Sequence, residues 1–416
     1  MVKPKPVLLL AISLCCLSAL PRHTATTDGN GKPLVTAITK DAATSLYTAP
    51  LKDSRPLVLD LSGPLIWSTC DASHPTLECH HHECARAHSY HPHNGYGVAD
   101  EEDRFRCKCT AHPYNPFAGK AASGDLTRAM LSANATDGKN PLYPVSFTAV
   151  ASCAPDSLLA KLPAGAVGVA GLARTKLALA AQVARTQKVA NKFALCLPSG
   201  GQGVAIFGGG PLFLLPPGRP DVTERLAGET PLRRNPEFPG YYISAKGLAV
   251  NQEQVPLSSY GPLVVGLCSR IPYTVLRSDV YRPFVQAFDK ATAERKRVTP
   301  PVAPFELCYD SRELGSTRLG YAVPQVDLML EGGSNWTVFG GNSMVQVNDN
   351  TACFGFVRMK ESEKRRYFGA PAVVIGGFQM ENNLLVFDEE KAQLGFSGLL
   401  FGRQTTCSNF NFTLAA

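Results

Sequence analysis

Residues 57–63 of this 416-residue chain read Leu57-Val-Leu-Asp60-Leu-Ser-Gly63, a short apolar run that ends in an acidic residue and a glycine turn. A related pattern, Val264-Val-Gly-Leu-Cys268-Ser-Arg270, occurs in the second half. Each is followed farther along by an apolar run that ends in glycine, Val167-Gly-Val-Ala-Gly171 and Val373-Val-Ile-Gly376-Gly377. This loose internal duplication predicts two similar β-rich lobes.

The composition supports a strand-rich globular protein. Hydrophobic residues make up 44% and charged residues 18% of the chain, which is ordinary for a folded domain, while 32 prolines and 36 glycines exclude a mainly helical fold. Apolar residues at helical spacing predict helices over 176–189 and 280–295. Because prolines crowd together between 211 and 240, we expect an N-terminal β lobe over 26–215 and a C-terminal β lobe over 216–416.

The first residues predict the compartment. Lys3 and Lys5 precede an apolar run from Val7 to Leu20, and the small Ala25 follows, as in a secretory signal peptide over 1–25. No later run of roughly 20 apolar residues predicts a membrane span. We therefore expect a secreted, extracellular protein without a membrane anchor. Three Asn-x-Ser/Thr sequons predict glycosylation, at Asn134, Asn335 and Asn411.

The charge of the chain argues against nucleic acid as a partner. The formal net charge is +7, but the basic residues are scattered and no Lys/Arg-dense arm is present. Nothing in the sequence predicts an oligomer, so we expect a monomer.

Thirteen cysteines indicate a disulfide-stapled protein. Cys15 and Cys16 lie in the predicted signal peptide, which leaves eleven and hence at most five disulfides with one thiol left over. Five of the eleven lie between Cys70 and Cys109, which predicts a compact, disulfide-rich insert over 70–112 in the first lobe. The others are widely spaced and would connect distant parts of the chain, namely Cys153, Cys196, Cys268, Cys308, Cys353 and Cys407.

The insert also raises the question of a metal. Its segment Cys79-His-His-His-Glu-Cys84 carries the residue types that bind zinc. In an oxidising compartment the thiols should instead form disulfides, so we predict no specific metal site. The glycine runs at 200–203 and 208–210 lack the lysine of a phosphate-binding loop and the spacing of a dinucleotide fingerprint, and no cofactor is expected.

Longer segments carry a family resemblance. The run from Val374 to Ser397 resembles the closing segment of pepsin-like aspartic peptidases. The chain more narrowly resembles the cereal endoxylanase inhibitors of the TAXI type in several blocks, among them Trp67-Ser-Thr-Cys70, 167–173, 188–198, 203–211, Tyr242-Ile-Ser-Ala and Asp279-Val-Tyr-Arg-Pro. The resemblance implies an all-β, bilobal, pepsin-like fold with short helices. It also implies a plant-defence protein of the apoplast or cell wall that binds the active-site cleft of microbial family-eleven endo-1,4-β-xylanases.

An aspartic peptidase needs two carboxylates about 3 Å apart that share a proton, one from each lobe. Asp60 is present in the first turn, but Leu61 and Ser62 replace the usual hydroxyl residue and glycine. Cys268 and Arg270 replace the aspartate and glycine of the second turn. We therefore predict no peptidase activity and treat Asp60, Ser62, Cys268 and Arg270 as vestigial positions. Arg270 could point toward Asp60 or outward.

Cys268 could act as a nucleophile only with a base within hydrogen-bond reach. All histidines after the predicted signal peptide lie between His74 and His112, in the insert. We therefore expect Cys268 to be the buried, unpaired thiol.

In the TAXI type, a histidine on the loop before the last cysteine enters the target. Here residues 399–407 contain no histidine, so Arg403 or Gln404 would have to reach the xylanase carboxylates. The predicted contacts are Leu400, Phe401, Arg403, Gln404 and Thr405, with Val298, Thr299 and Pro300 in a second loop. Two alternatives remain: a binding protein of the basic seven-S globulin type, whose partner is a peptide or another glycoside hydrolase, and a residual enzyme that uses Asp60.

Overall fold

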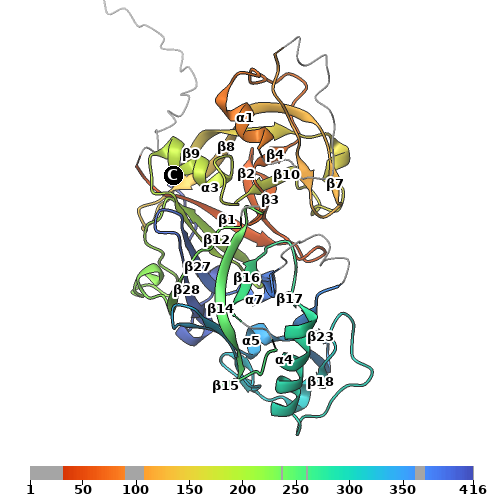
Figure 1. Cartoon of the computed structure of the whole chain (residues 1–416). Helices are drawn as coiled ribbons and strands as arrows, with labels where there is room; N and C mark the ends of the chain where they lie inside the picture. Colours follow the sequence, from red (N-terminus) through yellow and green to blue (C-terminus); the bar gives the residue numbers. More distant parts are fainter. Residues whose placement is uncertain (1–30, 90–106, 236–237, 259–260, 361–370, 416) are drawn as a thin grey trace, which may run out of the picture.

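The computed structural model describes residues 31–89, 107–235, 238–258, 261–360 and 371–415. Strands dominate it and form two large sheets, of 13 and 8 strands, with three small ones. The first half of the chain forms the upper lobe of Figure 1, and much of the second half forms the lower lobe. The predicted signal peptide, 1–25, lies outside the described residues, as does part of the Cys/His-rich insert, 90–106.

The first lobe is organised around a short strand inserted between two others. β10 (Gly168–Gly171) pairs in parallel with β3 (Arg55–Asp60) and antiparallel with β4 (Ile66–Ser68). β4 in turn pairs in parallel with β9 (Tyr143–Cys153). The chain therefore turns after Asp60 and later returns as β10. This strand lies beside β3, the strand that ends at Asp60.

The second lobe repeats this arrangement. β26 (Val373–Ile375) pairs in parallel with β16 (Leu263–Leu267) and antiparallel with β17 (Thr274–Leu276). β17 pairs in parallel with β25 (Phe356–Arg358). The same four-strand order in the same directions confirms the duplication that the sequence predicts.

A shared sheet joins the two halves. β27 (Asn383–Asp388) and β28 (Gln393–Leu399), from the end of the chain, pair with each other, and β27 also pairs with β11 (Lys192–Cys196). Aromatic rings pack beneath this junction: the Phe193 and Phe387 ring centroids lie 4.6 Å apart at 9°. The hydroxyl of the buried Tyr241 donates to Leu172 O at 2.8 Å, which adds a polar tie across the junction.

The remaining strands extend the sheets or form small hairpins. They are β1 (Leu34–Lys40), β2 (Tyr47–Lys52), β5 (Thr110–Ala111), β6 (Tyr114–Asn115), β7 (Lys120–Ala121), β8 (Gly124–Ala135), β12 (Gln202–Phe207), β13 (Gly228–Pro231), β14 (Tyr241–Val250), β15 (Glu253–Gln254), β18 (Cys308–Asp310), β19 (Ser316–Thr317), β20 (Gly320–Tyr321), β21 (Val326–Leu330), β22 (Asn335–Val338), β23 (Met344–Asn348) and β24 (Thr351–Phe354).

The helices are few and short. α3 (Leu179–Gln187) and α4 (Ser278–Ala291) confirm the two predicted helical stretches. α1 (His82–His88) was not predicted, because its histidine-rich sequence between cysteines is typical of a loop and shows no clear helical periodicity. The other helical turns are α5 (Gly340–Ser343), α7 (Gly377–Met380) and the 3₁₀ turns η1 (Asp156–Leu159), η2 (Val222–Glu224), η3 (Ser311–Glu313), η4 (Leu400–Arg403) and η5 (Cys407–Asn409). No helix among the described segments is both long and apolar enough to span a membrane.

Among the described residues five disulfides form, as the cysteine count predicts, and Cys268 is the free, buried cysteine, as its position in the second turn predicts. Three of them hold the first-lobe insert, and two connect the more distant cysteines. The pairs are Cys70–Cys153, Cys79–Cys107, Cys84–Cys109, Cys196–Cys407 and Cys308–Cys353.

Candidate functional site

The ends of β3 and β16 place Asp60 and Cys268 in matching positions. In the first lobe Asp60 is paired with Gly171 of β10. In the second lobe Leu267 is paired with Ile375 of β26, and Cys268 N donates to Ile375 O at 3.0 Å. If this register is continued by one residue beyond β16, Cys268 lies opposite Gly376. Asp60 lies opposite Gly171 in the same way.

Ser269 ties the two turns together. Its hydroxyl donates to Leu59 O at 2.8 Å and accepts the Leu61 N–H at 3.1 Å, and all three residues are buried. Only the second turn supplies a hydroxyl for these bonds. Leu61, the matching residue of the first turn, has no hydroxyl that could bond to the backbone of the second turn. The bonds nevertheless fix the two turns against each other.

Arg270 points toward Asp60. Its Nε lies 3.3 Å from Asp60 Oδ1, and the two side chains are 22% and 3% exposed. The same carboxylate oxygen accepts the Ser62 N–H at 2.9 Å. Gly63 also packs tightly here, because a Cβ on it would come within 3.0 Å of Asp60 Oδ2 and 2.9 Å of the Gly171 Cα. Asp60 is thus a buried carboxylate that faces a guanidinium, and its matching position in the other lobe holds a thiol.

Two of the described histidines, His74 and His88, have partners within the first lobe and not at Cys268. Cys268 is 7% exposed. His74 Nε2 lies 3.1 Å from Asp125 Oδ2 and His88 Nε2 lies 2.7 Å from Thr110 O, both partners in the first lobe. A nucleophilic Cys-His pair of the kind found in hydrolases is therefore not assembled from these imidazoles.

The histidines of the insert lie beside cystines. His74, His80 and His88 each lie with two cysteine sulfurs within 4.8 Å, but in every case the two sulfurs form a disulfide. Metal binding by cysteine requires the thiolate, so these sulfurs are unavailable as ligands.

The loop that follows β28 differs from the sequence-based expectation. Leu400 and Thr405 are buried, and the Thr405 hydroxyl donates to Leu215 O at 2.8 Å. Their side chains pack inside the molecule, and their role as contact residues stays a prediction. Phe401 and Arg403 are half-buried, and Gln404 is exposed with φ 54°.

Arg403 is held by its own chain. Its Nη2 donates to Arg225 O, and its carbonyl accepts from Arg219 Nη1. Burial, with a smaller contribution from Arg225, lowers the pKa of Arg403 below its usual value. The guanidinium therefore braces the loop, and Gln404 is the exposed residue among the contacts predicted on this loop.

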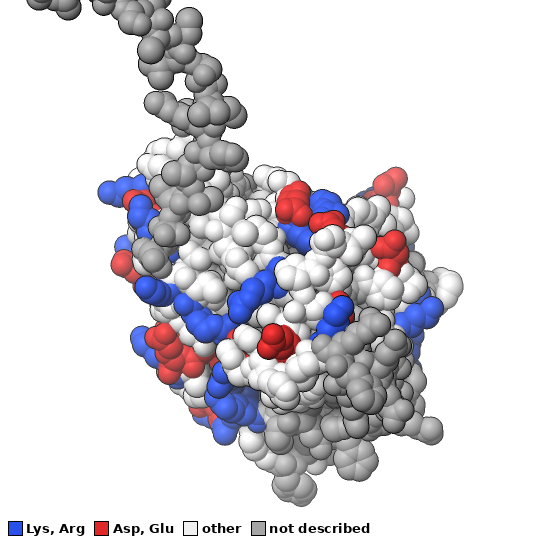
Figure 2. Space-filling model, turned by 90° about the horizontal axis from the view of Figure 1, so that it is seen from above, with Lys and Arg blue, Asp and Glu red and all other residues white. Residues whose placement is uncertain are grey.

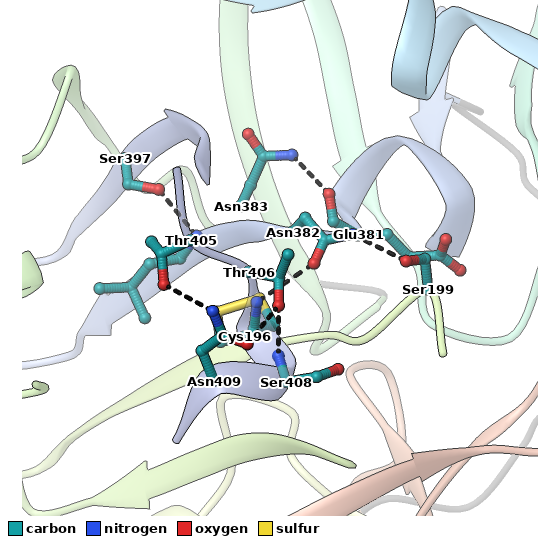
Figure 3. The surroundings of a disulfide bond; sticks show 12 residues. Cys196, Ser199, Glu381, Asn382, Asn383, Ser397, Thr405, Thr406, Ser408 and Asn409 are labelled. Carbon is teal, nitrogen blue, oxygen red and sulfur yellow. Dashed lines mark hydrogen bonds between the residues drawn. A yellow bond between two sulfur atoms is a disulfide. The ribbon is translucent and has the colours of Figure 1, made fainter. Parts of the chain in front are cut away.

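The loop after β28 is anchored to β11 by the Cys196–Cys407 disulfide, which Figure 3 shows with its polar surroundings. Asn382 is the central partner: its carbonyl accepts the Leu400 N–H at 2.8 Å and its Oδ1 accepts the Cys407 N–H at 3.1 Å. Asn382 Nδ2 donates to Ser199 Oγ at 3.0 Å. Both ends of the loop are thus fixed to the shared sheet.

The second predicted contact loop lies elsewhere. Val298 is half-buried against the cluster around Phe305 and the Cys308–Cys353 disulfide, whereas Thr299 and Pro300 are exposed. In Figure 1, α4 and β18, which flank this loop, lie on the other side of the lower lobe from β28. The structure therefore does not bring the two predicted contact loops together.

Sequence reasoning missed one buried polar cluster between the halves. Glu381, which follows α7, accepts the Tyr47 hydroxyl at 2.7 Å and lies 2.6 Å from Lys40 Nζ. Burial raises the pKa of Glu381 above its usual value, although Lys40 and Tyr47 each lower it. Burial likewise raises the pKa of Tyr47. The sequence signal for this cluster is the polar run Glu381-Asn-Asn within an otherwise apolar segment.

The three sequons differ in accessibility. Asn335 is exposed at the start of β22, whereas Asn134 within β8 and Asn411 near the C-terminus are half-buried. Glycosylation at these three positions stays a prediction.

Comparisons with known proteins cover nearly the whole chain. Residues 47–209 match the family model described as "Xylanase inhibitor N-terminal", and residues 240–398 match "Xylanase inhibitor C-terminal". A protein of Oryza sativa subsp. japonica named "Chitinase CLP" is 75% identical over 425 residues, covering 98% of this chain and 99% of its own. "Probable aspartic proteinase GIP2" of Nicotiana benthamiana is 34% identical over 445 residues, covering 98% of each.

Two solved structures are also similar. The crystal structure of edgp has a TM-score of 0.80 and 33% sequence identity, and covers 93% of this chain and 99% of its own. The structure of basic 7S globulin from soybean has a TM-score of 0.73 and 27% identity, and covers 92% of this chain and 99% of its own.

Proposed function

The chain belongs to the xylanase-inhibitor family whose N-terminal and C-terminal models it matches, and from this premise we propose that it is a secreted inhibitor of microbial family-eleven endo-1,4-β-xylanases. Membership confirms the bilobal, pepsin-like fold class expected from the sequence. The inhibitor would act in plant defence by blocking the xylanase active-site cleft. Five disulfides support an extracellular location, because such bonds persist in oxidising compartments.

The observation that carries the proposal is the pairing of Asp60 with Arg270. Peptide hydrolysis by this fold requires two close carboxylates that share one proton. Here one carboxylate faces a cation and the matching position holds Cys268, which supports a binding protein without peptidase activity. The rigid scaffold would then serve to present a loop to a partner.

The loop after β28 supports inhibition in a particular form. It is anchored by the Cys196–Cys407 disulfide and by Asn382, so little conformational entropy is lost when it binds. Gln404 would enter the xylanase groove, where a catalytic acid and a nucleophilic carboxylate lie, and its amide could donate to either. Phe401 would pack at the rim of the groove, and Thr299 and Pro300 would offer a separate contact.

A second candidate is a binding protein of the basic seven-S globulin type, whose partner is a peptide or another glycoside hydrolase. The similarity to basic 7S globulin from soybean over 92% of the chain favours it. A third candidate is chitin hydrolysis, since the 75% identical rice protein is named a chitinase. Glycoside hydrolysis by the usual mechanism requires two carboxylates about 5 to 10 Å apart, and the pairing of Asp60 with Arg270 argues against a role for Asp60 in it.

One experiment separates these candidates. The purified protein is titrated against a panel of family-eleven and family-ten xylanases on arabinoxylan, and is assayed in parallel for release of product from chito-oligosaccharides and from denatured protein at acid pH. We expect inhibition of at least one family-eleven enzyme and no hydrolysis of either substrate. Hydrolysis of chito-oligosaccharides would replace the inhibitor proposal with an enzyme. If the protein inhibited no xylanase and hydrolysed neither substrate, the result would favour the globulin-type binding protein.

A further inference from the structure

A shallow basin of about 440 Å³ opens on the first lobe between α1 and α3. Three cationic side chains line it: Arg86 from α1, Arg185 from α3, and Lys176 from the segment that leads into α3. Ala181, Ala184 and Val189 give it an apolar floor, and Asn191 and Glu390 complete the lining. Both helices belong to the upper lobe of Figure 1.

Two of the cations are fixed by a buried carboxylate. Arg86 Nη1 lies 3.0 Å from Glu83 Oε2, and Arg185 Nη2 lies 3.2 Å from Glu83 Oε1. The Glu83 side chain is only 4% exposed, whereas the two arginines are 31% and 44% exposed. Each guanidinium carries five N–H donors, so one ion pair leaves several for a ligand. Glu83 therefore orients two arginine forks from different helices before any ligand arrives, which lowers the entropic cost of binding.

The remaining groups set the kind of ligand. Lys176 is exposed and adds a third cation. Glu390, the acidic residue among those that line the basin, accepts the Asn191 N–H at 2.8 Å, and the three cations outnumber it. Figure 2, which views the molecule from above, shows Lys and Arg side chains interspersed with Asp and Glu side chains on an otherwise uncharged surface. Arginine forks match the geometry of carboxylates, and the small aliphatic floor suits a ligand with an apolar face.

We propose that this basin binds a polyuronate, a linear polysaccharide whose sugar rings each carry a carboxylate. Successive carboxylates would meet Arg86, Arg185 and Lys176, and the C–H faces of the rings would lie on Ala181, Ala184 and Val189. The size of the site favours a linear polymer over a folded acidic protein. A protein interface typically involves about 20 to 30 residues a side, far more than line this basin. The site is independent of the proposed xylanase inhibition, since none of its lining residues belongs to the loops at 298–300 or 400–405.

The test is calorimetric titration of the full protein with a short oligogalacturonate at low ionic strength, with a neutral xylo-oligosaccharide of the same length as the uncharged control. Lys176→Glu reverses an exposed charge that makes no contact with Glu83. Ala184→Glu places a carboxylate on the floor of the basin at a helical position. We expect each variant to weaken oligogalacturonate binding at least about tenfold, because a carboxylate then opposes the ligand. The neutral sugar should not bind.

The matched control is Lys246→Glu, which makes the same change in net charge as Lys176→Glu at an exposed position on β14 in the other lobe. It should leave the affinity unchanged. Equal weakening by Lys246→Glu would overturn the proposal in favour of attraction by net charge alone. Wild-type binding by both basin variants would overturn it as well. If oligoglutamate of the same charge bound the basin as tightly, an acidic polypeptide would replace the polyuronate. Xylanase inhibition by the two basin variants should match wild type, so a failure here is distinct from a failure of the proposed function.

Discussion

The Nε atom of Arg270 lies 3.3 Å from Oδ1 of Asp60, so a guanidinium from the second turn faces the buried carboxylate of the first. The neighbouring Ser269 joins the same two turns by two hydrogen bonds. A pair of turns that could support acid–base chemistry in this fold is thereby used to hold the halves of the molecule together.

The Ser269 tie should contribute measurably to stability. Ser269→Ala would leave the Leu61 N–H and the Leu59 carbonyl without these partners in a buried place, and we expect the free energy of unfolding to fall by about 2 kcal/mol. Denaturant unfolding measures the loss. Ser269→Thr keeps the hydroxyl and serves as the control, with a smaller effect. Equal stability of the alanine variant and wild type would show that the tie is not stabilising.

The pH dependence of stability should reveal Glu381. Because burial raises its folded-state pKa above the unfolded value, its contribution to stability is complete below the unfolded pKa and is lost as pH rises through the folded pKa. Glu381→Gln keeps an acceptor for Tyr47 and removes the titration. Wild type should therefore lose stability relative to this variant as pH rises above the unfolded pKa of about 4, as denaturant unfolding over a series of pH values would measure. A difference between the two proteins that does not change with pH would contradict the assignment.

The thiol count should separate Cys268 from the cystines. Since Cys268 is buried, the native mature protein, which lacks Cys15 and Cys16 of the predicted signal peptide, should react slowly with a thiol reagent such as dithionitrobenzoate. The same protein, unfolded but not reduced, should release one equivalent. Cys268→Ser should release none. Fast reaction of the native wild type would mean that this position is open to solvent.

The loop after β28 should depend on Gln404 more than on Arg403. Gln404→Ala would remove an exposed side chain and should weaken inhibition of a sensitive xylanase about tenfold, which corresponds to about 1.4 kcal/mol. Arg403→Ala removes a brace to the Arg225 carbonyl, so it should act mainly by lowering the melting temperature. If Arg403→Ala and Gln404→Ala both left inhibition intact, this loop would not be the element that enters the target.

Local sequence pattern predicts the duplicated strands well. The runs that end at Asp60 and Gly171 are short, apolar and bounded by turns, and the structure pairs them as neighbours. The cysteine count likewise predicts five disulfides and one unpaired cysteine, because oxidised cysteines pair and one must remain. The family resemblance of the second turn, and not the count, points to Cys268 as that cysteine.

The orientation of side chains in loops and buried clusters could not be predicted in the same way. Leu400 and Thr405 are buried where the chain packs against residues near Leu215, far away in sequence. Glu381 meets Tyr47 across a separation of 334 residues. Such contacts depend on the packing of the whole molecule, and no local period in the sequence encodes them.

The most direct test of the central claim is a steady-state inhibition measurement with a family-eleven xylanase at several concentrations of soluble arabinoxylan. Blocking of the active-site cleft predicts competitive inhibition, in which the apparent KM rises with inhibitor while kcat stays constant. It also predicts that the inhibited xylanase remains uncleaved. No inhibition across a panel of family-eleven enzymes, or a fall in kcat at unchanged KM, would contradict the account.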